Sequence, residues 1–219
     1  MKQTQIQNSS GQLFIKICGL TNPCEAKACV EFGANAVGVV FFKKSPRNIS
    51  FEAARKLCSP LPDKALTTGV FVNESYDFIM KAADMCRLKA VQLHGNESPH
   101  LVRDIAQNGI RVIKAVFEKQ EPFINKVTLY EHAWAYLVEK GHGKLPGGTA
   151  RRWSWRIDRK LFSDKKIIIA GGLAPCNVEK AVEVSGAFGV DVSSGVESSP
   201  GIKDLDKVKK FIEKAGARP

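Results

Sequence analysis

Side chains that can transfer a proton or bind an anion recur at the ends of short apolar runs in this sequence. Cys18 ends the run LFIKIC, His94, Glu139 and Asp191 stand at the ends of three others, and Arg47 follows a fifth. A thiolate or a carboxylate can remove a proton, a carboxylic acid can donate one, and a guanidinium binds a carboxylate through two parallel hydrogen bonds. These residue types suggest acid–base chemistry on an anionic small molecule.

Apolar runs of strand length recur along the whole chain. Their hydrophobicity is nearly continuous rather than alternating, which is typical of parallel strands buried on both faces. The segments between them are long enough for one crossover helix each. The eight runs are residues 14–18, 36–42, 68–72, 90–94, 112–116, 135–139, 167–170 and 190–192.

The segments between these runs carry helix signals of unequal strength. Asn22 can cap a helix, and Glu25, three residues later, is placed for a capping box. Residues 98–109 open on Ser-Pro, close on glycine and carry an apolar stripe between them. The segments 117–133 and 140–166 are less regular and predict helices only weakly.

A strand–helix unit repeated eight times predicts an α/β fold, a single-domain (βα)8 barrel over residues 13–219. Right-handed crossovers and a closed sheet leave no edge strand in such a barrel. The alternative is an open doubly wound sheet, which usually carries a G-x-G-x-x-G loop after its first strand. The first turn here reads Cys-Gly-Leu-Thr and is no such loop. Residues 1–12 are polar and are expected to form a loose N-terminal extension.

The chain is basic, with 33 Lys and Arg against 22 Asp and Glu and a formal net charge of +11. A nucleic-acid-binding protein usually concentrates such charge on one face, with aromatic residues that stack on bases. Here the lysines are scattered, and the group at 207–210 lies on an amphipathic segment whose apolar residues face a core. We therefore expect no nucleic-acid partner, and the surplus charge favours anionic small molecules.

The six cysteines include no close C-x-x-C pair, so no metal site is predicted. The N-terminus is polar, and no apolar stretch approaches the length of a transmembrane helix. We interpret the thiols as free and the setting as reducing and cytoplasmic, without a membrane partner.

Two loops of small residues follow the last two predicted strands. One contains Gly171 and Gly172, and the other contains Ser193, Ser194 and Gly195. Small residues let backbone N–H groups approach a ligand, and the loops after strands seven and eight are the usual phosphate site of this barrel. Tight turns are the plainer alternative, but the two loops in this order favour phosphate binding.

Cys18 and Glu139 end the first and sixth predicted strands, on different sides of the barrel mouth. A substrate anchored between them would meet one group that removes a proton and one that donates it, the minimum for isomerising a sugar. Plainer interpretations exist, since a strand-end cysteine is often a small buried apolar residue and a lone glutamate a surface carboxylate. His94 is equally a ligand contact or a hydrogen-bonded strand end. Arg47 is equally a carboxylate-binding or a solvated loop residue.

Several segments resemble, in order, the phosphoribosylanthranilate isomerase family of tryptophan biosynthesis: KICGLTN, GVVFFKKSPRNIS, GVFVN, VQLHGNE, VIKAV, IAGGL and GVDVSSGVESSPGIKD. The resemblance runs from about Ile15 to the C-terminal helix. It implies an Amadori rearrangement in a (βα)8 barrel, without metal or organic cofactor. A general acid would open the ribose ring of N-(5-phosphoribosyl)anthranilate, and a general base would then take the C2 proton. The resulting enolamine would tautomerise to the 1-deoxyribulose product.

The resemblance also implies roles for individual residues. It makes Cys18 the general base and Arg47 the contact of the anthranilate carboxylate. It implies a small phosphoribosyl substrate as the binding partner, and we expect a monomer or weak homodimer. Further motif positions match substrate-binding residues (Gln92, His94, Asp191) and phosphate-binding residues (Gly171, Gly172, Ser193, Ser194, Gly195).

Two positions depart from the family pattern. The family has an aspartate as general acid where this chain has Glu139, which we expect to be the acid here. The extra methylene moves the carboxyl group by about 1 Å, and a misplacement of that size can cost on the order of 100-fold in rate. The following loop reads Gly147-Gly148-Thr149-Ala150-Arg151, where the family has a segment like GGTGK.

Three alternative functions remain open at this point. The related barrel isomerase of the histidine pathway shares the Amadori chemistry, but it normally shows an aspartate rather than Cys18 at the end of strand one. A non-catalytic barrel that binds a phosphorylated ligand would show no turnover. A basic nucleic-acid-binding protein would show salt-sensitive affinity.

Overall fold

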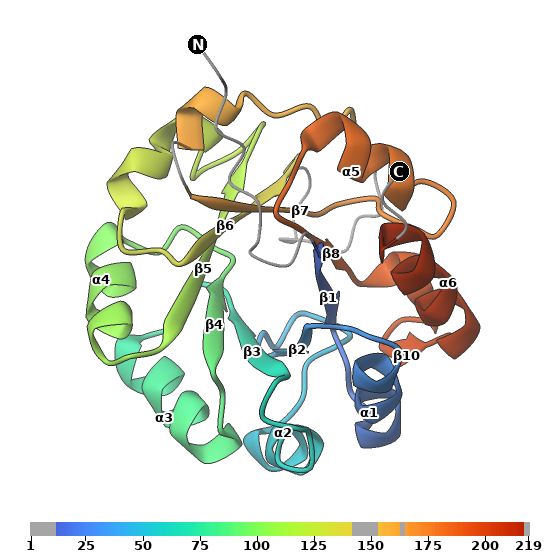
Figure 1. Ribbon diagram of the computed structural model, residues 1–219. Helices are drawn as coiled ribbons and strands as arrows, with labels where there is room; N and C mark the ends of the chain where they lie inside the picture. Colours follow the sequence, from blue (N-terminus) through green and yellow to red (C-terminus); the bar gives the residue numbers. More distant parts are fainter. Residues whose placement is uncertain (1–11, 142–152, 163–164, 217–219) are drawn as a thin grey trace.

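The structure is a computed structural model that describes residues 12–141, 153–162 and 165–216 of the 219-residue chain. Eight parallel strands pair in chain order and form a closed barrel, because β8 pairs with β1. Figure 1 shows this barrel end-on, with the helices in an outer ring. The predicted (βα)8 barrel is confirmed. Apart from Gln12, the predicted extension lies outside the described residues.

The eight strands agree with the predicted apolar runs to within about two residues at each end, the usual uncertainty of such boundaries. Their burial explains the near-continuous hydrophobicity, since one face packs in the barrel interior and the other against the helices. The strands are β1 (Phe14–Cys18), β2 (Ala36–Val40), β3 (Leu66–Phe71), β4 (Ala90–Leu93), β5 (Arg111–Phe117), β6 (Ala135–Glu139), β7 (Lys166–Ile169) and β8 (Gly189–Val192).

Helices fill the outer ring, but not uniformly. After β5 and β6, where the sequence is least regular, the described residues form only 3-10 helices, η1 (Ile124–Tyr130) and η2 (Arg159–Phe162). The α-helices are α1 (Pro23–Glu31), α2 (Phe51–Cys58), α3 (Tyr76–Cys86), α4 (Pro99–Gln107), α5 (Val178–Ser185) and α6 (Leu205–Gly216).

Side-chain caps start the helices after the first strands. In α1 the Asn22 side chain accepts from the Cys24 N–H, as the sequence predicts, and Ser98 caps α4 by accepting from the N–H of Leu101. The capping box predicted with Glu25 is wrong, because the Glu25 carboxylate accepts instead from the backbone N–H of Lys203 at 3.1 Å. Glu25 thus joins α1 to the other end of the chain.

A short antiparallel hairpin after β8 was not predicted. It consists of η3 (Ser194–Val196), β9 (Glu197–Ser199) and β10 (Ile202–Lys203), and it leads into α6. Its strands are too short to stand out as apolar runs. The hairpin matters for the site because it carries two buried charged residues, Glu197 and Lys203.

The opposite end of the barrel is closed by aromatic rings. Phe14 stacks on Phe188 with ring centroids 5.5 Å apart and meets Trp134 edge-on at 5.8 Å. Ala36, Leu66 and Ala90 complete this layer, and the cavity lies at the other end of the barrel, among the carboxyl ends of the strands. In the part of the chain that the structure describes, no helix is long and apolar enough to cross a membrane.

Candidate active site

A cavity of about 240 Å³ lies among the carboxyl ends of the strands. The structure brings together every residue that the sequence singled out as a candidate. Those lining the cavity are Cys18, Arg47, Gln92, His94, Glu139, Gly171, Gly172, Asp191, Ser193, Ser194 and Gly195. The loop Gly147–Arg151 lies outside the described residues.

Cys18 ends β1 with its side chain in the barrel interior, beside Val40 and Val70. Gly38 on the neighbouring strand makes room for it, since a Cβ there would lie 2.8 Å from the Cys18 sulfur. Burial raises the pKa of the thiol, and the nearby Lys16 ammonium opposes that rise without cancelling it. The thiol is therefore mainly protonated at neutral pH in the unliganded protein.

Lys16 is a site residue that the sequence reasoning missed. It is fully buried, its Nζ lies 2.9 Å from a carboxylate oxygen of Asp191, and it also hydrogen-bonds the sulfur of Cys18. Burial alone would lower the pKa of Lys16, but Asp191 and Cys18 outweigh it and raise that pKa, so Lys16 stays charged. The available signal was the strand period of two, which puts Lys16 and Cys18 on the same face.

Arg47 reaches the cavity from the loop after β2 and is held by Glu197. Its Nε and Nη2 donate to the two carboxylate oxygens of Glu197 at 2.8 and 2.6 Å, and Lys203 donates to the same carboxylate at 2.7 Å. The sequence predicted Arg47 but neither of its partners. Gly19, next to Cys18, lets the Arg47 side chain pass, since a Cβ there would clash with it at 2.4 Å.

Gln92, His94 and Glu139 line the other side of the cavity, from β4 and β6. The Gln92 Nε2 lies 2.8 Å from Nδ1 of His94, and the His94 Nε2 lies 3.5 Å from a carboxylate oxygen of Glu139 without making a hydrogen bond to it. Within the described part of the chain, Gln92 Oε1 and His94 Nε2 are buried without a hydrogen-bond partner.

The two loops of small residues have the backbone that the sequence suggests. Gly171 and Gly172 both adopt positive φ, +82° and +69°, where a side chain would be strained. A Cβ at Gly195 would lie 1.8 Å from the Leu173 carbonyl oxygen, so the two loops touch through their backbones. The buried hydroxyl of Ser193 has no hydrogen-bond partner among the described residues. Such a cradle leaves backbone N–H groups accessible to an anion.

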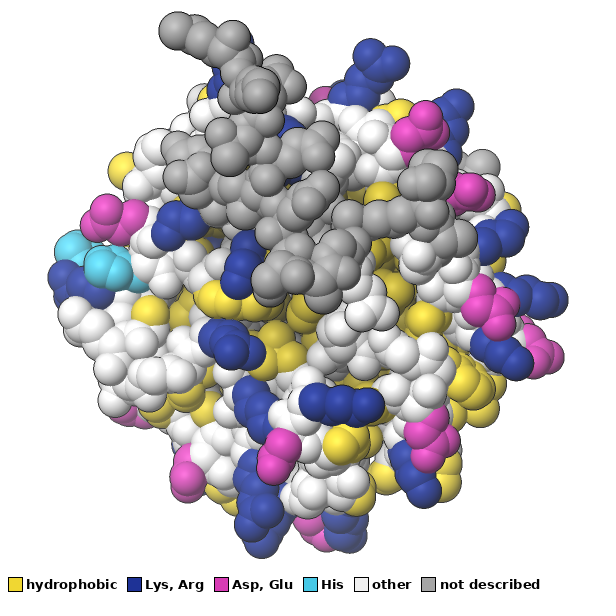
Figure 2. All heavy atoms as spheres, viewed as in Figure 1, with side chains coloured by type: hydrophobic (Ala, Val, Ile, Leu, Met, Phe, Trp, Pro, Cys, Tyr) yellow, Lys and Arg dark blue, Asp and Glu magenta, His cyan; other side chains and the backbone are white. Residues whose placement is uncertain are grey.

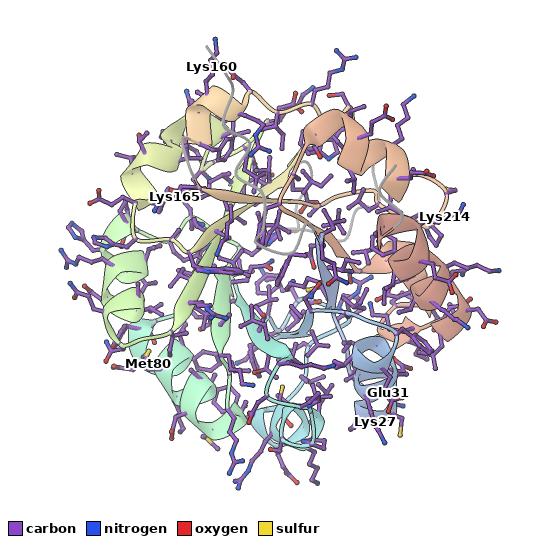
Figure 3. The ribbon with its side chains drawn as sticks, in the orientation of Figure 1. Lys27, Glu31, Met80, Lys160, Lys165 and Lys214 are labelled. Atoms are coloured by element: carbon purple, nitrogen blue, oxygen red, sulfur yellow. The ribbon has the colours of Figure 1, made fainter. Side chains whose placement is uncertain are left out.

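The distribution of Lys and Arg side chains, and the grouping of side chains that could bind a metal ion, bear on the kind of ligand that this site can bind. Figure 2 shows Lys and Arg side chains scattered over the face in view, and Figure 3 places Lys27, Lys160, Lys165 and Lys214 at separate points of the periphery. On the face in view, the described Lys and Arg side chains do not gather into the single basic patch that is typical of nucleic-acid binding. Among the described residues, no three His, Cys, Asp or Glu side chains are grouped to hold a metal ion.

Comparison with known proteins gives one consistent result. The family model for N-(5'phosphoribosyl)anthranilate (PRA) isomerase matches residues 15–214. The N-(5'-phosphoribosyl)anthranilate isomerase of Desulfatibacillum aliphaticivorans is 48% identical over 92% of each chain. A solved phosphoribosylanthranilate isomerase in complex with reduced 1-(o-carboxyphenylamino)-1-deoxyribulose 5-phosphate has a TM-score of 0.82 and 40% identity, covering 93% of this chain and 98% of its own.

A second solved structure, of monomers generated from the dimeric isomerase of Thermotoga maritima, has a TM-score of 0.80 and 39% identity over 93% and 98% of the two chains. The family model spans the strands from β1 to β8 and the hairpin after them, so it includes every residue that lines the cavity. The barrel, the cavity residues and these similarities agree: the chain belongs to the N-(5'-phosphoribosyl)anthranilate isomerase family.

Proposed function

We propose that this chain isomerises N-(5'-phosphoribosyl)anthranilate to 1-(2-carboxyphenylamino)-1-deoxyribulose 5-phosphate, with Cys18 as the general base and Glu139 as the general acid. Family membership carries the reaction, an Amadori rearrangement in tryptophan biosynthesis. The single observation that carries the two roles is that Cys18 and Glu139 line one cavity from strands that are not neighbours, β1 and β6. A sugar chain bound between them would meet one group on each side.

The acid step uses the β6 side of the cavity. Protonated Glu139 gives its proton to the ring oxygen of the ribose, the bond from C1 to that oxygen breaks, and the anilino nitrogen supplies the electron pair that forms the Schiff base. Glu139 is about 6% exposed, and one of its carboxylate oxygens lies 3.5 Å from Nε2 of His94. A general acid must reach the atom that it protonates, and the Glu139 carboxyl group lines the cavity in which the ribose would bind.

The base step uses the β1 side. The Cys18 thiolate takes the proton from C2, and the C2 electron pair forms the C1–C2 double bond as the Schiff-base nitrogen accepts the C1 pair. The ammonium of Lys16, hydrogen-bonded to the sulfur, favours the thiolate that this step requires. The enolamine then tautomerises to the ketone product.

Groups that could bind both anionic parts of the substrate line the cavity. The guanidinium of Arg47 would hold the anthranilate carboxylate, and the loops at Gly171–Gly172 and Ser193–Gly195 would hold the phosphate. Gln92, His94 and Asp191 also line the cavity and would contact the ribose and the aromatic amine.

The setting of the enzyme is also part of the proposal. Residues 13–219 form the catalytic barrel, with residues 1–12 as an extension, and the chain works in the cytoplasm without a nucleic-acid partner. It is a monomer or a weak homodimer. Sedimentation at several protein concentrations measures this directly, since a weak dimer dissociates on dilution.

The proposal is tested by turnover. Freshly generated N-(5'-phosphoribosyl)anthranilate is added to purified protein, and loss of anthranilate-type fluorescence is followed. We expect rapid loss with the wild type and a fall of about 10²- to 10⁴-fold in kcat for Cys18→Ala, the usual contribution of a general base. The matched control is Cys29→Ala, which removes another buried thiol, on α1 and outside the cavity.

Cys29→Ala should keep its kcat. Folded wild-type protein without turnover would sink the proposal and favour a barrel that only binds a phosphorylated ligand. Equal losses in the two cysteine variants would remove Cys18 from its role.

A further inference from the structure

The carboxylate of Glu197 is shared by two cations beside the cavity. Arg47 donates two hydrogen bonds to this carboxylate, from Nε at 2.8 Å and from Nη2 at 2.6 Å, one to each oxygen. Lys203 donates to one of the same oxygens at 2.7 Å. The Arg47 side chain is 12% exposed, that of Glu197 5% and that of Lys203 0%. A buried, bidentate and doubly paired carboxylate differs in kind from a surface ion pair, which contributes little and moves freely.

The charges in this cluster do not cancel. Arg47, Lys203 and Glu197 together carry one net positive charge. Of these three residues, Arg47 is the one that lines the cavity. Burial alone would raise the pKa of Glu197, but the hydrogen bonds from Arg47 and Lys203 hold that pKa below its ordinary value, so the carboxylate is ionised at neutral pH. Glu197 with Arg47 alone would be a neutral pair with little attraction for another anion.

The cluster also fixes where Arg47 points. An arginine has five N–H donors in a rigid plane, and Glu197 uses two of them, so three remain for a ligand at the cavity wall. Lys203 is itself anchored, because its Nζ donates to the Ser193 carbonyl at 3.3 Å and its backbone N–H donates to Glu25. Through Lys203, the loop that holds Arg47 is tied to the loop expected to bind phosphate.

We propose that Glu197 and Lys203 are positioning residues for substrate recognition. Glu197 orients the Arg47 guanidinium, and Lys203 offsets the charge of Glu197 so that Arg47 keeps its attraction for the substrate carboxylate. This inference rests on the proposed function, because it assigns the anthranilate carboxylate to Arg47.

The test compares two ligands that differ only in the carboxylate. One is reduced 1-(o-carboxyphenylamino)-1-deoxyribulose 5-phosphate, and the other is the same compound with an unsubstituted phenyl ring. Affinities are measured by calorimetry for the wild type, Lys203→Met and Glu197→Gln. For Lys203→Met, affinity for the carboxylate ligand should fall by about 10- to 100-fold, the range of a lost charge-assisted contact, while affinity for the phenyl ligand stays within about twofold.

Glu197→Gln separates orientation from charge. It makes the cluster more positive, so a screening role alone would raise affinity for the carboxylate ligand, whereas loss of the anchor should lower it. For Glu197→Gln we expect affinity for the carboxylate ligand to fall about tenfold and affinity for the phenyl ligand to stay unchanged. Lys203→Arg is a separate variant that keeps the positive charge, and it should retain most of the affinity that Lys203→Met loses. A rise in carboxylate affinity in Glu197→Gln would overturn the orienting role.

Lys114→Met is the matched control. It breaks another buried ion pair, 2.8 Å from Nζ to Glu97, which does not line the cavity. It should lower thermal stability without changing the ratio of the two affinities.

If the Lys203→Met protein loses affinity for both ligands equally, Lys203 is merely structural and the inference is wrong. If Lys203→Met binds the carboxylate ligand as tightly as the wild type does, the inference is wrong but the proposed function is not affected. A wild type that binds neither ligand overturns the proposed function and the inference together.

Discussion

The residues that line the cavity differ between the two sides of the barrel mouth in whether a charged side chain pairs with them. On the β1–β8 side, two charged residues that line the cavity have buried partners: Asp191 pairs with Lys16, and Arg47 pairs with Glu197, whose carboxylate Lys203 shares. Gln92, His94 and Glu139, which line the β4–β6 side of the cavity, have no lysine or arginine partner among the described residues, and Gln92 Oε1 and His94 Nε2 lack hydrogen-bond partners. The buried Lys114–Glu97 pair also lies on this side of the barrel, but it does not line the cavity.

This difference assigns different work to the two sides. Paired charges on the β1–β8 side are fixed before the substrate arrives, so no reorganisation is needed to hold a carboxylate or to favour a thiolate. An unpaired buried polar group costs about 1–3 kcal/mol, and a ligand that satisfies it recovers that cost on binding. We therefore expect the substrate to supply hydrogen-bond partners for Gln92 and His94 on the β4–β6 side.

The largest expected effect comes from removing the acid on the β4–β6 side. Glu139→Gln keeps the size of the side chain but cannot donate the proton that opens the ribose ring. We expect kcat to fall by about 10²- to 10⁴-fold with ligand affinity nearly unchanged. Steady-state kinetics on N-(5'-phosphoribosyl)anthranilate measure both quantities. Full turnover by Glu139→Gln would show that another group is the acid.

Glu139→Asp is the companion variant, because it restores the residue that the family pattern leads us to expect. Gly171 packs closely against this side chain, since a Cβ atom added at Gly171 would lie 2.9 Å from Cγ of Glu139. A rise in kcat would mean that the glutamate is suboptimal here. A fall would mean that the cavity is shaped for the longer side chain.

A smaller effect should follow from removing the cation beside the thiol. Lys16 lowers the pKa of Cys18 against the opposing effect of burial, so Lys16→Met should raise that pKa further. The thiolate fraction at neutral pH then falls, kcat drops by about 10- to 100-fold, and the rise of activity with pH moves to more alkaline values. The pH dependence of kcat measures the shift.

Loss of a buried charge partner also destabilises a protein, by about 3–5 kcal/mol when the remaining charge stays unpaired. The variant Lys16→Met with Asp191→Asn removes that unpaired charge and is compared for thermal stability only, because the Asp191 carboxylate itself raises the pKa of Cys18. Lys114→Met is again the control, since it should lower stability and leave the pH profile in place. An unmoved profile in folded Lys16→Met would contradict the role given to Lys16.

The smallest effect tests the idea of unsatisfied polar groups. The hydroxyl of Ser193 is buried without a partner in the described structure, so Ser193→Ala should leave the melting temperature of the unliganded protein unchanged or higher. Affinity for the reduced product analogue should fall by about three- to tenfold, the value of one hydrogen bond. Calorimetry and thermal melting measure the two quantities.

Ser185→Ala provides the contrast, because its hydroxyl donates to the Ala181 carbonyl at 2.7 Å and accepts from the Ala187 N–H. That variant should melt lower and bind the analogue normally. If Ser193→Ala also melts lower, its hydroxyl has a partner in the unliganded protein and this explanation is wrong.

The sequence predicted the barrel well because its signals are local. Strands buried on both faces are apolar at nearly every position, and the residue at the end of each strand is placed by the barrel itself. Cys18, Glu139 and the loop at Gly171 could therefore be assigned to one mouth without knowing any contact. The irregular segments after β5 and β6 were also recognisable as weak helices.

The charge pairs were not predictable in the same way. Lys16 meets Asp191, 175 positions away, and Arg47 meets Glu197, 150 positions away. No local pattern encodes such contacts, and a lysine inside an apolar run gives no sign of which carboxylate it faces. Glu25 is the opposite case, since a strong local pattern predicted a capping box and the closure of the barrel brought the Lys203 N–H to it instead.

The most direct test of this account is a crystal structure with reduced 1-(o-carboxyphenylamino)-1-deoxyribulose 5-phosphate bound. We predict that its sugar chain lies between Cys18 and Glu139, with the carboxylate on Arg47. Ser193 and His94 should each gain a hydrogen-bond partner, while the Lys16–Asp191 and Arg47–Glu197 pairs keep their geometry. A ligand with Cys18 and Glu139 on the same side of its sugar chain, or His94 and Ser193 left without partners, would contradict the account.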